Sequence, residues 1–295
     1  MFKKSIHYFL YRVDSADDLP REIASLVLRY LPDYDGIIVI PPQDYPVLRT
    51  GWLRALPFGW RTTPARTLAF GRQHIVIVEA APHEEPRTIV VPLADLLYSE
   101  LAVDLLYAYL RLVWAGADRQ HTLTAEFNTT GMRILRQHFD RARAGISADG
   151  ALPVLEPGGV LGDLPLKFHN YTHYALLPDE RVEAAVFQPA PRHEGRWRLT
   201  APKPARSFTQ TDRNLIIIEE MTAWPSSNYG LVTRLIPRRQ VRGVAWEQDA
   251  DGQRVCLTLG AGAGAAQMRY LVSEENTALW RATPAEHHAP PAAGR

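Results

Sequence analysis

The sequence predicts a mainly β protein with capping helices, built from two tandem antiparallel modules. The first observation is a repeat: residues 64–80, PARTLAFGRQHIVIVEA, return as residues 204–220, PARSFTQTDRNLIIIEE, without a gap. The second is that each copy is followed by short runs of alternating apolar and polar residues, which is the period of a β-strand. The composition, 46% hydrophobic and 22% charged over 295 residues, supplies enough apolar material for two cores.

Each module begins with a lead-in and then the repeated phrase. The lead-in of the first module is a helix over residues 19–30 and a strand over 34–42, and that of the second is a strand over 179–190. The phrase predicts a loop and then a β-branched run short enough to be a buried strand.

The correspondence continues downstream at an offset of 145, where TIVVPLADL (88–96) matches TRLIPRRQV (233–241). The aligned positions of the next alternating strand are Leu110/Val255, Leu112/Leu257 and Trp114/Leu259. Each copy then has a strand, a polar break at Asn128 or Ser273, and a helix that this polar residue caps. Read alone, residues 98–115 are equally compatible with a helix, and only the repeat favours two strands there.

The composition along the chain predicts four regions. Residues 1–146 form the N-terminal domain with its leading helix, and residues 147–165 form a linker rich in Gly and Pro. Residues 166–284 form the C-terminal domain, and the Pro/Ala-rich residues 285–295 form a disordered tail.

The order of TDRNLIIIEE (211–220), YGLVTRLIPRRQVRGV (229–244), alternating strands and a closing SEENTALW (273–280) resembles bacterial pleckstrin-homology-like (PH-like) domains and the related GRAM domains. The resemblance covers most of the second module and extends less clearly to the first, which lacks the Asp-Gly turn of EQDADGQRV. It implies two tandem antiparallel β-barrels, each closed by a C-terminal helix. Members of this superfold bind lipid headgroups or peptides, so the resemblance leaves the ligand open.

Charge and cysteine content argue against several classes of protein. The net charge of +1 gives no global attraction to nucleic acid, so an electrostatic partner must use a local patch. Cys256 is the single cysteine and lies in an alternating run, which favours a buried inert thiol and a cytoplasmic setting. The longest apolar region contains too many charges for a membrane-spanning helix, so any membrane association is peripheral, at the inner face.

Motifs for catalysis, metal or cofactor are weak. Gly260 and Gly262 start a glycine string, but a strand-like run follows instead of the helix that a dinucleotide site requires, so a hairpin turn is favoured. His169 and His173 stand four apart without a third zinc ligand nearby. With no nucleophile motif either, we expect a protein without catalysis, metal or cofactor.

A basic stretch in the second module is the first candidate binding site. Residues 192–242 contain ten Lys or Arg and four acids, a net charge of +6, and arginine forks suit phosphate or carboxylate. A solvated face without a partner is the competing interpretation. The predicted basic patch consists of Arg192, Arg196, Arg198, Lys203, Arg234, Arg238, Arg239 and Arg242.

The corresponding part of the first module is apolar, with too many hydrophobic residues for one face of a half-exposed sheet. The predicted apolar face consists of Leu93, Leu97, Leu101, Leu105, Tyr109 and Trp114. We expect this face to pack against the second module, the N-terminal segment or a second copy of the protein.

These observations predict an adaptor or scaffold that docks a protein through the apolar face and an anionic partner through the basic patch. The alternative is a peripheral membrane module that binds acidic phospholipids, with each basic residue contributing about 1 kcal/mol near an anionic surface. A third interpretation is an enzyme with a pocket near His169, His173 and Asp179. Nucleic acid is not an expected partner.

Overall fold

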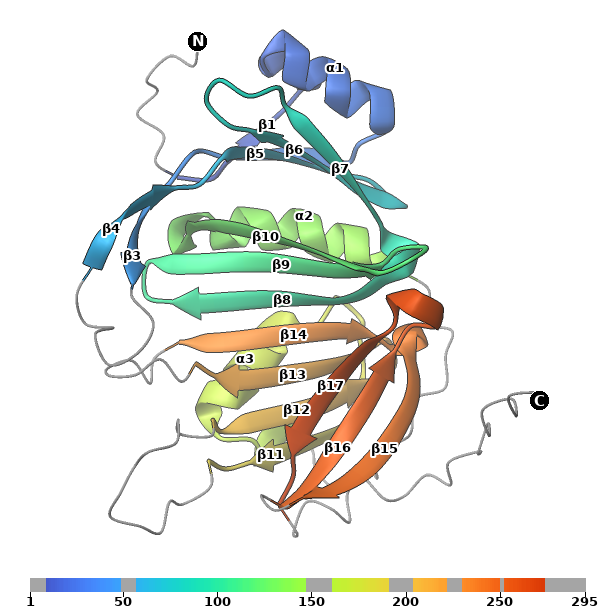
Figure 1. Cartoon of the computed structure of the whole chain (residues 1–295). Coiled ribbons are helices and arrows are strands. Elements are labelled where there is room, and N and C mark those ends of the chain that lie inside the picture. The colour runs from blue at the N-terminus through green and yellow to red at the C-terminus, as the bar shows by residue number, and fades with distance from the viewer. Residues whose placement is uncertain are drawn as a thin grey trace, which may run out of the picture.

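The computed structural model describes residues 9–48, 57–146, 161–190, 204–221, 230–249 and 252–273. Over these residues the protein is mainly β, as the sequence predicts. In Figure 1 a five-stranded sheet lies above a seven-stranded sheet, a three-stranded sheet lies beside the lower strands of the seven-stranded sheet, and a separate hairpin curves away from the first.

The five-stranded sheet belongs to the first half of the chain, residues 9–146, and has the order β1-β2-β5-β6-β7. Its strands are β1 (Tyr11–Val13), β2 (Gly36–Ile40), β5 (Ala65–Phe70), β6 (His74–Ala80) and β7 (Arg87–Pro92). The separate hairpin consists of β3 (Asp44–Leu48) and β4 (Pro57–Thr62). The helix predicted over residues 19–30 is confirmed as α1 (Arg21–Tyr30), which packs on β6.

The seven-stranded sheet has the order β10-β9-β8-β14-β13-β12-β11 and contains strands of both halves. The first half contributes β8 (Leu96–Asp104), β9 (Tyr107–Ala115) and β10 (Gln120–Asn128). The second half, residues 161–273, contributes β11 (Val182–Gln188), β12 (Arg206–Thr211), β13 (Asn214–Glu220) and β14 (Leu231–Pro237). Residues 98–115 therefore form two strands, as the repeat predicted.

The three-stranded sheet completes the second half. Its strands are β15 (Val241–Asp249), β16 (Gly252–Leu259) and β17 (Ala266–Leu271), in that order. The glycine string is the turn between β16 and β17, so the predicted hairpin is confirmed. Cys256 lies in β16 and is buried, also as predicted.

The repeated phrase forms the same hairpin in both halves. Arg66 of β5 lies opposite Glu79 of β6, and its Nε is 2.7 Å from Glu79 Oε1. Arg206 of β12 lies opposite Glu219 of β13 and makes the same ion pair. The strand order also corresponds, since β2-β5-β6-β7 and β8-β9-β10 in the first half match β11-β12-β13-β14 and β15-β16-β17 in the second.

A short 3-10 turn separates the two strand groups of each half: η2 (Leu93–Asp95) in the first and η5 (Arg238–Gln240) in the second. Among the described residues no ladder connects the two groups of one half, so the expected closed barrels are not found. Instead β8 pairs with β14, with Leu101 opposite Thr233. In each expected barrel, this strand edge would have paired within its own half. In the structure it pairs with the other half instead.

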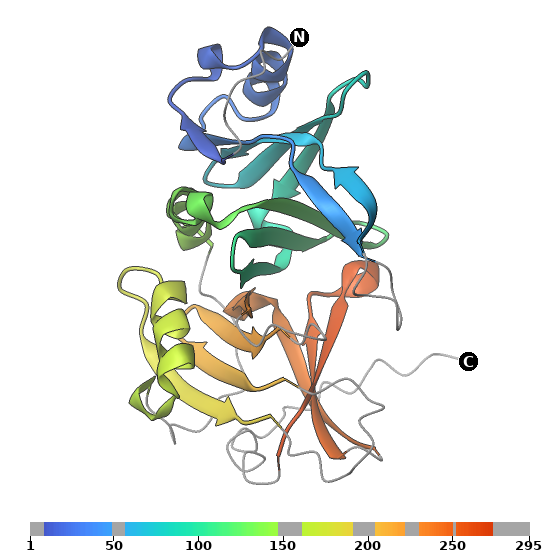
Figure 2. The same ribbon diagram turned by 90° about the vertical axis from the view of Figure 1, so that its left-hand side faces the viewer.

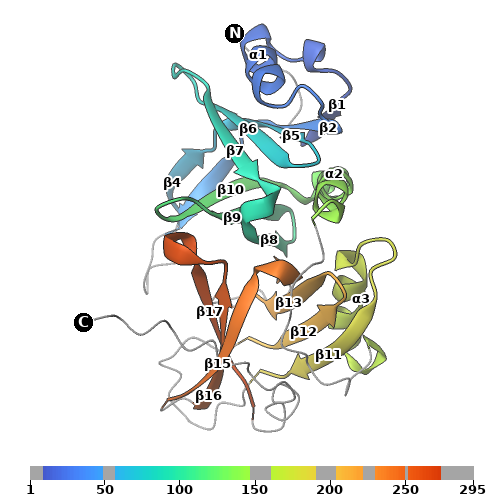
Figure 3. The same cartoon turned by 90° about the vertical axis from the view of Figure 1, so that its right-hand side faces the viewer.

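Two helices cover one face of the seven-stranded sheet: α2 (Met132–Ala144) and α3 (Leu166–Ala175). Both lie on the same side of it (Figures 2 and 3). Asn128 caps the 3-10 turn η3 (Thr129–Gly131) that leads into α2, because its Oδ1 accepts a hydrogen bond from the Thr130 amide at 3.0 Å. The predicted cap therefore lies on this turn, and Gly131 precedes α2 without a side-chain cap. The helix predicted after Ser273, most of the linker and the predicted tail lie outside the described residues.

The halves also share a hydrophobic core. Leu97 of β8 and Val113 of β9 are fully buried in one cluster with Ile236 and Leu257 of the second half. Gly260 allows this approach, since a Cβ there would lie 2.5 Å from Leu97 Cδ2, and its φ of +70° favours glycine as well.

Candidate binding cleft between the two halves

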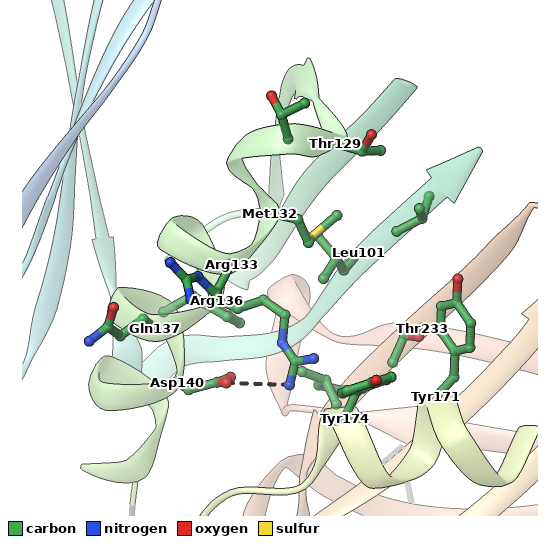
Figure 4. A pocket seen from close by; sticks show the side chains of 15 residues that line it. Leu101, Thr129, Met132, Arg133, Arg136, Gln137, Asp140, Tyr171, Tyr174 and Thr233 are labelled. Atoms are coloured by element: carbon green, nitrogen blue, oxygen red, sulfur yellow. Dashed lines mark hydrogen bonds and ion pairs between the residues drawn. The ribbon is translucent and has the colours of Figure 1, made fainter. Parts of the chain in front are cut away.

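A cleft of about 920 Å³ lies between α2 and α3, over the strands that join the halves (Figure 4). Its floor contains Leu101 and Val103 of β8 and Thr233 and Leu235 of β14. In the ladder Leu101 lies opposite Thr233, so strand alternation turns these side chains toward the helices. Neither half forms this floor alone.

The two helices form the walls. The wall on α2 consists of Met132, Arg133, Arg136, Gln137 and Asp140, together with Phe139 below them. Their spacing of three and four residues places them on one helical face. The wall on α3 consists of Tyr171, Tyr174 and Ala175 (Figure 4).

The helices run in the same direction and meet at their C-terminal ends. There Arg143 of α2 donates a hydrogen bond from Nη2 to the Ala175 carbonyl of α3. At the other end Lys167 of α3 pairs with Glu220 of β13 at 3.2 Å, and Glu220 lies opposite Leu231 of β14. Both helices therefore begin at the end of the sheet that carries the β8–β9 turn, and we call this end the mouth of the cleft.

The described lining of the cleft has a positive balance. Asp140 accepts a hydrogen bond from Arg143 Nε at 2.9 Å. It also forms an ion pair with Arg136, whose Nη2 lies 3.4 Å from the carboxylate. Arg143 is buried, and this burial lowers the pKa of its guanidinium despite the nearby carboxylate. Because Asp140 serves two arginines, and Arg133 is exposed beside them, the described lining favours an anionic group near the mouth.

Two exposed leucines lie at the mouth, in the β8–β9 turn. Leu105 and Leu106 are 74% and 68% exposed. The turn is fixed by Thr129, whose hydroxyl donates to the Leu105 carbonyl at 2.8 Å and whose amide donates to the Leu106 carbonyl at 3.2 Å. Arg133 follows Thr129 by one helical turn, so apolar and cationic side chains are close at this end.

The face of the seven-stranded sheet that is opposite the cleft carries a row of ion pairs, and we call the β8–β14 contact in this sheet the joint. Glu100 of β8 accepts hydrogen bonds from Tyr109 at 2.6 Å, from Arg111 at 3.0 Å and from Arg234 of β14 at 2.7 Å. Burial alone would lower the pKa of Arg234, but Tyr270, Glu100 and Glu219 raise it above its ordinary value. The ion pair between the buried Glu100 and the half-buried Arg234 links the two halves.

The predicted basic patch is therefore not a free surface where the structure describes it. Arg234 is engaged by Glu100, Arg238 pairs with Glu183 at 3.0 Å, and Arg239 donates to the Leu93 carbonyl at 2.8 Å. Arg242 is exposed. The other four predicted residues, Arg192, Arg196, Arg198 and Lys203, lie outside the described residues. The sequence gives the number of basic residues in this stretch. It does not show that Glu100 of β8 and Glu183 of β11 pair with two of them.

The residues of the predicted apolar face divide between two sides of the sheet. Leu93 and Leu97 are buried at the joint, and Trp114 is buried against His121. Leu101 lies in the cleft floor, Leu105 is exposed at the mouth, and Tyr109 binds Glu100. The expectation that this region packs against the second half is met by Leu97 and not by Leu105.

The cleft residues on α2 and α3 were missed at the sequence level. Arg133, Arg136, Tyr171 and Tyr174 fall in segments that we interpreted as helices only, or left without assignment. The available signal was the basic helix MRILRQHFDRARA. His169 and His173 lie on α3 outside this lining, and in the part of the chain that the structure describes no cluster of three metal-ligating side chains occurs.

Comparisons of the chain with protein-family models, with curated proteins and with solved structures find no match in any of the three. None of the helices in the described ranges has the length and apolar character that crossing a membrane requires.

Proposed function

We propose that this chain is a non-catalytic binding module of two tandem PH-like domains, whose partner docks in the cleft between α2 and α3. The partner presents an apolar stretch next to acidic groups. The observation that carries this proposal is the cleft itself, where the β8–β14 ladder supplies an apolar floor and Arg133 and Arg136 supply positive charge.

The PH-like assignment is supported by the corresponding order of elements in the two halves. Four antiparallel strands, a 3-10 corner and three further strands correspond in the two halves, while β1 and the β3–β4 hairpin are additions of the first half. A 3-10 turn capped by Asn128 leads from the last strand of the first half into α2. In this proposal the two barrels remain open toward each other and share one sheet.

A scaffold role is supported by the way the halves are held together. The Glu100–Arg234 ion pair and the Leu97 core contact fix β8 against β14, so the cleft is formed before a partner arrives. A preformed site loses less free energy to ordering when a partner binds.

Dodecyl phosphate, used below its micelle concentration in titration calorimetry, tests this function because it joins one alkyl chain to an anionic group. We expect it to bind, and dodecyltrimethylammonium and inorganic phosphate to bind weakly or not at all. Replacing both cleft arginines (Arg133→Gln with Arg136→Gln) lowers the affinity at least about tenfold, since a hydrogen bond to a charged group contributes about 1.5–3 kcal/mol. The matched control is Arg141→Gln, on the same helix outside the lining. Equal binding of the cationic probe, or an equal loss in the control, contradicts the proposal.

One observation favours a second function, peripheral binding to acidic phospholipids. The exposed Leu105 and Leu106 are bound through their carbonyls to Thr129, which precedes Arg133 by one helical turn. This arrangement combines apolar insertion with charge attraction. Co-flotation with neutral and with acidic vesicles tests it. Salt-sensitive binding to acidic vesicles that is lost on Leu105→Ser with Leu106→Ser, but kept on Leu28→Ser in α1, supports this function, and no flotation with acidic vesicles rules it out.

A further inference from the structure

We infer that the occupant of the cleft is an amphipathic α-helix of a partner protein, with acidic residues flanking its apolar stripe. The inference rests on the proposed function and specifies the partner of the same site. It follows from the shape of the cleft, from its lining and from the position of its charges.

The shape fits a helix. Two helices, inclined to each other, already cover one face of the seven-stranded sheet, and the cleft between them has a strand floor and helical walls (Figure 4). At 1.5 Å per residue, the lining residues of α2, from Met132 to Asp140, extend over about 12 Å, and those of α3, from Tyr171 to Ala175, over about one turn. A guest helix of about two turns matches the longer wall and would present side chains at i, i+3 or i+4, and i+7 to the floor.

The lining resembles the centre of a protein interface. Tyrosine, phenylalanine, methionine and arginine are enriched in such centres, and lysine, glutamate and aspartate are depleted. The described lining contains Tyr171, Tyr174, Phe139, Met132 and two arginines, with Asp140 as its acid. Tyr174 is 63% exposed, so a partner could bury its ring, and the flexible Met132 side chain can adapt to different guests. This composition favours a protein segment over an alkyl chain.

The charges determine where the acids of the guest lie. Arg133 and Arg136 are three residues apart near the mouth, whereas Asp140 lies toward the C-terminal ends of the helices, where Arg143 contacts Ala175, and would repel a carboxylate there. A guest with two acids one turn apart can pair with both arginines. Its opposite end, over Asp140 and Ala175, is expected to be uncharged or basic.

Selection from a displayed library of random 16-residue peptides tests this inference. The wild-type chain is used for capture, and Tyr174→Ala with Arg133→Glu is used for counter-selection. Both replaced side chains are exposed, so this variant is expected to fold. We expect the enriched peptides to share apolar residues at helical spacing with Asp or Glu at one end, and to bind the variant at least tenfold more weakly. Tyr30→Ala with Arg141→Glu, a matched pair outside the cleft, is expected to bind them like the wild type.

A charge exchange adds a second readout. Replacing the acid of a selected peptide by Lys should weaken binding to the wild type and restore binding to the Arg133→Glu chain. Enriched peptides without a helical period, or peptides whose binding ignores the cleft variant, overturn the inference. Dodecyl phosphate binding in the cleft without any cleft-dependent peptide leaves the proposed function standing and overturns the helix. Loss of both kinds of binding overturns both. Acidic vesicles that bind through the cleft, in place of peptides, assign it to a lipid instead.

Discussion

Strands β7 and β14 occupy the same position in the two halves and are used differently. Ile89 of β7 lies opposite Ile77, and Arg234 of β14 lies opposite Ile217, which is the equivalent register. β7 is an edge of the five-stranded sheet, whereas β14 is an interior strand of the seven-stranded sheet. Arg234 forms an ion pair with Glu100 of β8, whereas the apolar Ile89 at the equivalent position cannot form one. The difference indicates that a few side chains decide whether the same strand ends a sheet or joins two halves.

Removing the carboxylate of this joint should have the largest effect. Glu100→Gln is expected to lower the free energy of unfolding by about 3–5 kcal/mol, because the Glu100 carboxylate is buried and accepts hydrogen bonds from Tyr109, Arg111 and Arg234. Its loss leaves Glu219, at 3.5 Å, as the carboxylate paired with the half-buried Arg234. Urea unfolding followed by circular dichroism measures this change.

The control for this prediction is Glu85→Gln, an exposed glutamate before β7, which should leave stability within about 0.5 kcal/mol. Replacing the pair by apolar residues, Glu100→Leu with Arg234→Ile, makes β14 resemble β7 and should recover part of the loss, since Tyr109 and Arg111 still lack their acceptor. If the double variant is as unstable as Glu100→Gln, the ion pair supplies more than a satisfied charge. If Glu100→Gln behaves like the control, the comparison of β7 with β14 fails.

The core contact at the joint comes next. Leu97→Ala should cost about 3 kcal/mol, because Leu97 is fully buried between the halves and its deletion leaves a cavity beside Gly260. Arg242 holds the equivalent position in the second half, since Leu96 lies opposite Trp114 and Val241 lies opposite Leu259. Arg242→Ala is therefore the matched control. It is exposed and should change the urea midpoint little. Equal costs at the two positions would mean that Leu97 does not belong to a joint.

The repeat made much of the fold predictable, while the joint and the cleft were not predictable. Alternating positions such as Leu110, Leu112 and Trp114 lie in the predicted strand, because the period of apolar residues is a local property of the chain. The pairing of Glu100 with Arg234 joins residues 134 positions apart, and no local pattern encodes it. The cleft depends on that same pairing, since its floor alternates between β8 and β14. The arginines of α2 are evident in the sequence, but the sequence does not show that they line the same cleft as the tyrosines of α3.

A buried histidine tests the first half separately from the joint. His138 of α2 stacks on Phe70, lies against Gly36, and has no hydrogen-bond partner within the described residues. Burial, and then the charges of Arg12 and Arg141, lower its pKa from 6.5. The unfolded chain therefore binds a proton more readily, so stability is fully present above pH 6.5 and falls as the pH decreases below it.

His138→Phe should remove this pH dependence of the free energy of unfolding. The part that is lost amounts to about 1.4 kcal/mol for a tenfold difference in proton affinity between the folded and the unfolded chain. Urea unfolding between about pH 8 and about pH 5 measures it, with the exposed His83→Phe as the control. Carboxylates such as Glu126 contribute at lower pH. Burial would raise the pKa of Glu126, but hydrogen bonds from Arg61 and Tyr107 lower it below 4.5 overall. An unchanged slope in His138→Phe would contradict the assignment.

The smallest effect is expected in the β8–β9 turn. Leu105 has a φ of +50°, a left-handed conformation that costs a residue with a side chain about 1–2 kcal/mol, and the β15–β16 turn has Gly252 at +122° instead. Leu105→Asn should therefore raise the free energy of unfolding by about 0.5–1 kcal/mol, because Asn adopts this region more readily. Leu106→Asn, which replaces its neighbour outside that region, should leave stability unchanged. A stabilised Leu105→Asn chain that still binds the selected peptides separates the turn from the cleft. If the stabilised Leu105→Asn chain no longer binds acidic vesicles, the strained turn serves to expose Leu105 to a membrane surface.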